Sequence, residues 1–195
     1  MITEDSGFNA PLLNGWPRNF LEITFGNQDQ ASDMKSKYSS LSDGSVSVEM
    51  INRFVQEDAY RILFSGRKNS FWKLSSTKKL DWTEEASQSG VLSIDFRVLQ
   101  SDKTKPLIFS SLCGDDCGSS FILDDSIVKN QWINIGVDIS CMGDSGLDLS
   151  KISEPLEMSS EGFWEFEIGE IKLIGGTGGT SMMFCPVDQK NRESI

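Results

Sequence analysis

The sequence predicts an all-β protein, an antiparallel β-sandwich or jelly roll. Apolar residues recur with a period of two in many short runs, and turns rich in Gly, Ser and Asp separate these runs. No long stretch shows the 3.6-residue spacing of an amphipathic helix. We therefore expect about eight to ten short strands.

The first half of the predicted sandwich consists of short apolar runs. The run at 20–25 stops at Gly26, and the polar segment 27–44 is interpreted as a loop. Alternation begins at Ser45. Strands are then predicted at residues 46–50, 60–64 and 71–74.

The second half shows the alternation most clearly, in residues 91–99, 132–139 and 163–174. In the last of these the apolar phase changes at Gly169, which predicts a β-bulge. Two further strands, at 106–112 and 121–123, flank a turn that contains two cysteines. The residues predicted to form the core are Leu92, Ile94, Phe96, Val98, Ile133, Ile135, Val137, Phe166 and Ile168.

The chain has 195 residues, which suits one well-cored domain with tails. Residues 1–18 are expected to be an irregular N-terminal segment or linker, and residues 19–174 the sandwich. Residues 175–195 begin with Gly-Gly-Thr-Gly-Gly-Thr and are expected to form a flexible Gly-rich tail.

Composition excludes several functional classes. The net charge is −11, from 18 Lys and Arg against 29 Asp and Glu, so nucleic acid and anionic membrane surfaces are not expected partners. No run of about 18 apolar residues predicts a membrane span, and the first residues lack the pattern of a signal peptide. The absence of histidine excludes Ser-His-Asp and Cys-His nucleophiles and His-ligated zinc.

The turn "LCGDDCG" at 112–118 places Cys113 and Cys117 close together in sequence, each followed by a glycine. A tight turn brings such a pair within disulfide range, so we expect a disulfide or two buried thiols at a hairpin tip. Cys141 is an alternative partner for either cysteine, and Cys185 is placed in the loose tail. A redox centre is not favoured, because the spacing is not Cys-x-x-Cys at a helix start.

Several segments also resemble a known family, the C-terminal accessory domain of ExoP-type exo-β-glucanases in glycoside hydrolase family 3. The resemblance covers residues 14–174. Its most specific parts are "QEDAYRI" followed by "SG", the Cys-Gly-x-x-Cys-Gly turn, and a later Ser-Cys after a strand that begins with Trp. The segments are "NGWPRNFLEITF" (14–25), "SDGSVSVEMINRFVQEDAYRILFSG" (42–66), "KKLDWTEEASQSGVLSIDFRVL" (78–99), "SLCGDDCGSSFIL" (111–123) and "QWINIGVDISCM" (131–142) with "LDLSKISEPLEMSSEGFWEFEIGEIKL" (147–173).

The resemblance implies a galactose-binding-like sandwich and a non-catalytic, carbohydrate-binding accessory module of a β-glucosidase or exo-glucanase. It does not extend to the family's catalytic domains, so no catalytic residue is assigned, and the chain is either a fragment or a stand-alone module. The expected partners are a β-glucan or oligosaccharide and the catalytic domains of the hydrolase. The expected location is extracytoplasmic, which suits disulfides. The alternative function is a protein-interaction module that docks on catalytic domains without binding sugar; an independent enzyme is a third, weaker hypothesis.

Tryptophans are the best ligand candidates, because sugar rings present apolar faces on which indoles stack. Trp72, Trp82 and Trp132 are predicted to bind ligand, since each lies near a turn or out of phase with an apolar stripe. Trp164 is assigned to the core, and Trp16 to the attachment of an upstream domain.

Most of the carboxylates are expected to be solvated. Glu57 and Asp58 are an exception, because they directly precede a predicted strand within the segment that most resembles the family. They are expected to fix a loop by accepting backbone N–H bonds, or to ligate a structural cation such as calcium. No other cofactor is expected.

Overall fold

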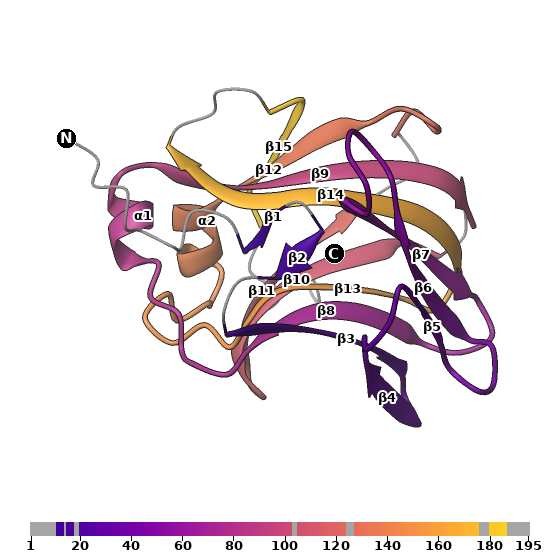
Figure 1. The fold of residues 1–195 in the computed structure, drawn as a ribbon. Coiled ribbons are helices and arrows are strands. Elements are labelled where there is room, and N and C mark those ends of the chain that lie inside the picture. The colour runs from indigo at the N-terminus through magenta and orange to yellow at the C-terminus, as the bar shows by residue number, and fades with distance from the viewer. Residues whose placement is uncertain are drawn as a thin grey trace.

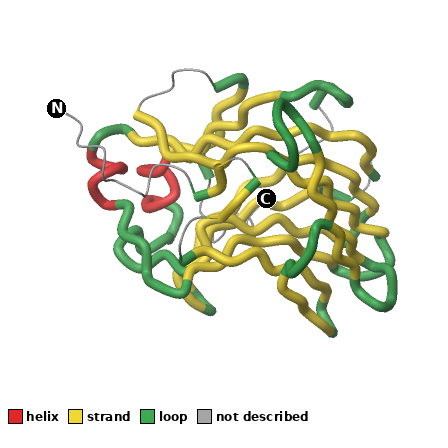
Figure 2. The backbone as a smooth tube through the Cα atoms, viewed as in Figure 1, coloured by secondary structure: helices red, strands yellow, loops and turns green. Residues whose placement is uncertain are grey.

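The computed structural model describes residues 11–13, 15–17, 20–102, 105–123, 127–175 and 180–186. Within these ranges two β-sheets pack face to face, and two short helices lie together at one end (Figures 1 and 2). The predicted fold class is therefore confirmed. The helices are α1 (Thr83–Ser87), inside a segment expected to be a loop, and α2 (Ile139–Asp144).

Sheet A has nine strands among the described residues, and its main path runs β15-β12-β9-β14-β7-β6-β5. Neighbours along this path are antiparallel except β15 and β12, which pair in parallel. The register between β9 and β14 shifts between Ile168 and Ile171, which confirms the predicted irregularity at Gly169. The strands are β1 (Leu12–Leu13), β2 (Trp16–Pro17), β5 (Tyr38–Ser40), β6 (Val46–Ile51), β7 (Ala59–Ser65), β9 (Gly90–Ser101), β12 (Ile133–Asp138), β14 (Phe163–Gly175) and β15 (Met182–Phe184).

Sheet B has six strands among the described residues, in the order β11-β10-β13-β8-β3-β4. All its neighbours are antiparallel. The strands are β3 (Leu21–Asn27), β4 (Gln30–Asp33), β8 (Ser70–Ser76), β10 (Leu107–Gly114), β11 (Cys117–Leu123) and β13 (Glu154–Ser160).

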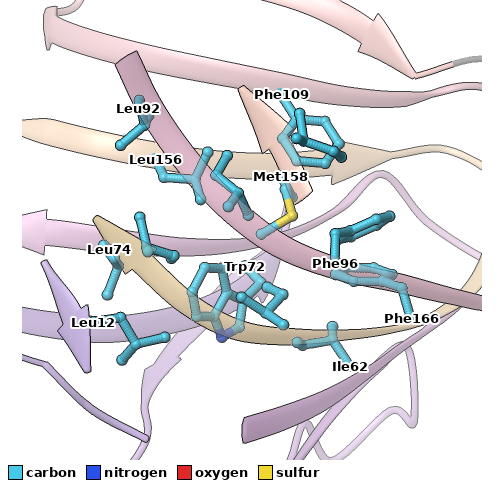
Figure 3. Close-up of a cluster of buried hydrophobic side chains, with 14 of the residues drawn as sticks. Leu12, Ile62, Trp72, Leu74, Leu92, Phe96, Phe109, Leu156, Met158 and Phe166 are labelled. Atoms are coloured by element: carbon cyan, nitrogen blue, oxygen red, sulfur yellow. The ribbon is translucent and has the colours of Figure 1, made fainter. Parts of the chain in front are cut away.

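The core lies between the two sheets, because alternate residues of each strand point inward. Phe96 of sheet A contacts Phe109 of sheet B with ring centroids 5.5 Å apart, and Phe166 lies 5.4 Å from Phe96 (Figure 3). Eight of the nine predicted core residues are buried, and Ile133, the first residue of β12, is only partly buried.

Both predicted tails contain ordered structure, which corrects the expected domain boundaries. Strands β1 and β2 pair with each other, and Leu12 is fully buried opposite Ile171 of β14. At the other end β15 joins the edge of sheet A, where Phe184 stacks on Phe121 at 4.7 Å. Residues 1–10, 176–179 and 187–195 lie outside the described residues.

Candidate functional site

A cleft of about 450 Å³ lies where the β1–β2 hairpin meets β3, the β4–β5 connection and the β6–β7 loop. We call it the Trp16 cleft. Its size is typical of small-molecule sites. It is lined by Trp16, Pro17, Leu21, Glu22, Ile23, Asp33, Met34, Lys35, Ser36, Lys37, Met50, Glu57 and Tyr60.

The lining of the cleft divides into buried apolar side chains and an exposed aromatic one. Leu21, Ile23, Met50 and Tyr60 are each no more than 7% exposed. Trp16, in contrast, is 64% exposed. An exposed indole beside an apolar floor offers a flat surface on which a sugar ring can stack.

The β1–β2 turn is fixed against β7 by a close backbone approach. The buried Tyr60 hydroxyl donates a hydrogen bond to the Gly15 carbonyl, and burial raises the pKa of the Tyr60 phenol. Gly15 has φ +72°, and a Cβ at this position would lie 2.0 Å from the Glu57 carbonyl oxygen. Only glycine fits both conditions, so Gly15 determines where Trp16 is placed.

Glu57 enters the cleft in a conformation that is rare for a residue with a side chain. Its φ is +58°, and its N–H donates to the Asn52 Oδ1 atom at 2.8 Å. The Glu57 carboxylate accepts a hydrogen bond from Lys37 Nζ at 2.9 Å, and this bond and the lysine charge lower the pKa of Glu57. Left-handed residues of this kind are enriched in ligand sites, where the surrounding structure holds them.

Asp58 organises the loop that carries Glu57. Its carboxylate accepts backbone N–H bonds from Arg53, Phe54 and Val55 at 2.6, 2.9 and 3.0 Å. Burial alone would raise the pKa of Asp58, but these N–H donors outweigh burial and lower it. The expected role of this segment in fixing a loop is therefore seen at Asp58.

The geometry does not support a cation at Glu57 and Asp58. Glu57 pairs with Lys37, whereas Asp58 is engaged by backbone donors. In the described part of the chain, no group of three or more His, Cys, Asp or Glu side chains is placed to hold a metal ion.

The rim of the cleft is polar and carries both charges. Glu22 and Asp33 supply acceptors, and Lys35, Ser36 and Lys37 supply donors. Sugar hydroxyls both donate and accept hydrogen bonds, so a mixed rim suits them. Glu57, held ionised by Lys37, is suited to accept a hydrogen bond and unsuited to act as a general acid, which needs a raised pKa.

Two of the three predicted ligand-binding tryptophans are buried, which corrects the prediction. Trp72 is 0% exposed on the inner face of β8, with its ring centroid 6.4 Å from that of Tyr60. Trp82 is 1% exposed immediately before α1. Neither is available to stack on a ligand at the surface, because both fill the apolar core.

Trp132 is half-buried and does not line the Trp16 cleft. The guanidinium carbons of Arg53 and Arg97 lie 4.2 and 5.1 Å from its ring centroid. Arg97 also forms an ion pair with Glu167, a carboxylate that is completely buried on sheet A. The indole of Trp132 thus takes part in a cation–π cluster on sheet A.

Trp16 is not among the tryptophans that the sequence predicts to bind ligand. The available signal was Gly15-Trp16-Pro17, a turn glycine beside a tryptophan that belongs to no alternating strand. Its exposure depends on the β1–β2 hairpin, which is fixed by contacts with residues 45 positions away in sequence.

The cysteines form two disulfides. Cys113–Cys117 closes the β10–β11 hairpin with Cα atoms 5.1 Å apart, as predicted. Cys141 pairs with Cys185, Cα atoms 5.3 Å apart, and not with either hairpin cysteine. This second bridge joins α2 to the residue that follows β15, which corrects the loose placement of Cys185.

Comparison with known families identifies the fold. A family described as Exop_C, galactose-binding domain-like, matches residues 22–173. The chain belongs to this family. The resemblance expected from the sequence is therefore confirmed. Comparison with curated proteins gave no match.

Solved structures share the fold of this Exop_C domain at low sequence identity. The extra C-terminal domain of an exo-1,3/1,4-β-glucanase from a Pseudoalteromonas species is 12% identical, with a TM-score of 0.75 over 91% of this chain and 98% of that domain. The same glucanase in its larger form is 14% identical, with a TM-score of 0.74 over 94% of this chain. This chain spans only 22% of the larger protein.

A more distant likeness is to a family 30 carbohydrate-binding module from a cellulosomal cellulase of Clostridium thermocellum. It is 11% identical, with a TM-score of 0.58 over 88% of this chain and 96% of that module. At this identity the likeness concerns the fold alone. Among the described residues no helix is long and apolar enough to cross a membrane.

Proposed function

We propose that this Exop_C domain is a non-catalytic carbohydrate-binding accessory module of a β-glucan hydrolase of glycoside hydrolase family 3, a β-glucosidase or exo-glucanase. The main support is the exposure of the Trp16 indole at a cleft that has an apolar floor and a rim of mixed charge. The ligand is a β-glucan or one of its oligosaccharides, since a neutral sugar matches both the indole and the acidic protein.

The related structures support the class of partner. One similar fold is a domain of an exo-1,3/1,4-β-glucanase, and a carbohydrate-binding module shares the same architecture. The catalytic partner is accordingly the rest of such a hydrolase. Two disulfides favour an oxidising, extracytoplasmic location for this domain and the hydrolase that contains it.

The test is isothermal titration of short β-1,3- and β-1,4-gluco-oligosaccharides into the wild-type chain and into Trp16→Ala. We expect weak binding by the wild type, because an open cleft buries few ligand atoms. Loss of the indole should weaken it by about 1.5–3 kcal/mol, roughly the value of one large apolar side chain. Phe54→Ala, an exposed aromatic that is not among the cleft residues, serves as the matched control. Equal affinity of Trp16→Ala and wild type would exclude the cleft.

A second function, docking on catalytic domains without sugar binding, is favoured by the tip of the β6–β7 loop. Phe54 and Val55 are 80% and 58% exposed there, although Asp58 holds the loop backbone firmly. Two adjacent exposed apolar side chains on a well-held loop offer a contact surface to a protein partner. If gluco-oligosaccharides produce no heat, and Phe54→Ala weakens association with separately expressed catalytic domains, this second function replaces the first.

A further inference from the structure

The outer face of sheet B carries two rows of side chains that cross its strands. Paired residues of neighbouring strands point to the same side of a sheet, so the register defines each row. The polar row runs through Thr24, Lys73, Glu157, Ser110 and Ser120 on β3, β8, β13, β10 and β11.

The adjacent row on the same face is largely apolar. It runs through Gly26, Phe71, Ser159, Ile108 and Ile122 on the same five strands. Between these two rows the alternate residues face inward and fill the core, for example Trp72, Met158 and Phe109. The two outer rows therefore lie side by side on the surface of the molecule.

An irregularity in β13 places two carboxylates beside Lys73. The register between β10 and β13 shifts between Ser110 and Leu112, so Glu157 pairs with Ser110 and Glu154 pairs with Leu112. Glu154 and Glu157 thus share the outer face although they are three residues apart. Bulges often redirect side chains next to functional sites.

The central carboxylates have unused hydrogen-bonding capacity. Lys73 Nζ binds Glu154 Oε1 at 2.7 Å, while the buried Oε2 atom of Glu154 has no partner among the described residues. The side-chain carboxylate of Glu157 makes no hydrogen bond or ion pair with any described residue, and burial, together with the charge of Glu154, raises its pKa. Buried acceptors are nearly always satisfied, so the unpaired Oε2 atom of Glu154 indicates a missing donor.

The apolar row provides a platform beside these acceptors. A Cβ on Gly26 would lie 2.6 Å from the Phe71 ring, so this glycine lets the ring rest against the β3 backbone. Lys73 Nζ lies 5.5 Å from the centre of the same ring, and Ile122 is 37% exposed at the far end of the row.

We infer that this outer face is a second contact site for an extended, neutral β-glucan chain, acting together with the Trp16 cleft. Such a chain has apolar ring faces and hydroxyl edges, and here an apolar row lies beside a row of donors and acceptors. Five strands spaced by about 4.8 Å span about 19 Å, enough for several sugar rings. The inference rests on the proposed function, because it assigns the same ligand class.

The two sites are joined through β3. Glu22 lines the cleft, and Thr24, two residues later on the same side of the strand, begins the polar row. Outward residues two apart on a strand are separated by about 7 Å. One long chain can therefore occupy both sites, whereas a trisaccharide fills only one of them.

The test compares long and short ligands on the folded chain. Affinity electrophoresis with soluble mixed-linkage β-glucan, and titration with a trisaccharide, are applied to wild type, Phe71→Ala, Glu157→Gln, Trp16→Ala and the control Phe54→Ala. We call Phe71→Ala and Glu157→Gln the face variants. We expect both to weaken polysaccharide binding roughly tenfold, because one of two linked contacts is lost. Their trisaccharide affinity should stay within a factor of two of wild type. Glu157→Gln keeps the side-chain shape, so the test does not depend on how Phe71→Ala folds.

The outcomes separate this inference from the proposed function. If polysaccharide affinity is unchanged in both face variants but is lost in Trp16→Ala, the second site is wrong and binding is assigned to the cleft alone. If the face variants lose polysaccharide affinity while Trp16→Ala binds fully, the outer face is supported as the site and the cleft is excluded. If wild type binds no glucan, both fail. If the face variants lose only association with catalytic domains, the face is a protein interface and the inference is wrong.

Discussion

At the scale of single residues, two neighbours determine the shape of the Trp16 cleft. Gly15 sets the course of the β1–β2 turn, and Glu57 holds a left-handed backbone against it. The two residues touch through the Glu57 carbonyl, so a change at one displaces the other. This close contact holds the turn that carries the exposed indole of Trp16.

We expect Gly15→Ala to destabilise the protein by about 1–3 kcal/mol. A Cβ would meet the Glu57 carbonyl oxygen at 2.0 Å, and φ is already +72°. Gly44→Ala is a matched control, because Gly44 has a similar φ of +68° with no atom within 4 Å of the added Cβ. Urea unfolding measures both. Equal losses in the two variants would show that the contact with Glu57 contributes nothing.

We also expect Asp58 to make stability depend on pH. Its pKa is lowered in the folded state, so its contribution is fully present above the unfolded value of about 3.9 and is lost as pH falls through the folded pKa. Asp58→Asn has one acceptor oxygen for three N–H donors and should cost about 1.5–3 kcal/mol at pH 7. The free energy of unfolding, measured between pH 2 and 7, should decrease less steeply toward acid pH in Asp58→Asn than in wild type. Asp144→Asn, at an exposed site, should retain the wild-type slope.

At the scale of elements, the two disulfides fasten different structures. Cys113–Cys117 closes a hairpin that the β10–β11 ladder already defines. Cys141–Cys185 instead retains β15, a three-residue edge strand. The second bridge therefore acts together with the pairing of β15 with β12 and the stacking of Phe184 on Phe121.

We expect removal of Cys141–Cys185 by serine substitution to cost about 4 kcal/mol, against about 2 kcal/mol for Cys113–Cys117. The cause is chain entropy in the unfolded state, since the bridged residues are 44 and 4 positions apart, respectively. Guanidinium unfolding of the two double-serine variants gives the comparison. An equal or reversed order would show that local packing, and not loop length, dominates.

Sequence patterns predicted most of the long strands, but not β13 (Glu154–Ser160), which lies in the middle of sheet B. Alternation identified β9, β12 and β14, because each buries one full face. It missed β1, β2 and β15, and also β4 and β5 within the segment interpreted as a loop, since strands of two to four residues show no measurable period. Trp72 shares the inward phase of Leu74, and this phase, not its position near a turn, determines its burial. The cleft itself is lined by residues that are distant in sequence, and a local sequence pattern cannot predict that they lie together.

At the scale of the whole molecule, the net charge of −11 favours a neutral ligand over an anionic one. A neutral glucan releases no counterions when it binds. We therefore expect its affinity to change less than about twofold between about 50 and 500 mM NaCl, because apolar contacts dominate. Affinity electrophoresis at several salt concentrations tests this expectation. A steep decrease with salt would indicate an ionic ligand and contradict the proposed ligand class.

The final prediction is that the chain alone hydrolyses no glycoside. A glycosidase needs a raised-pKa carboxylic acid and a second carboxylate on either side of the scissile bond, about 5–9.5 Å apart. In the Trp16 cleft Glu57 has a lowered pKa, because Lys37 holds it ionised. Among the described carboxyls, the one with a raised pKa, Glu157, lies instead on the outer face of sheet B, close to Glu154 on the same strand. Incubation with an aryl β-glucoside should release no phenol above the buffer rate. Turnover that disappears in Glu157→Gln or Glu57→Gln would contradict this prediction, and would make the corresponding face or cleft an active site.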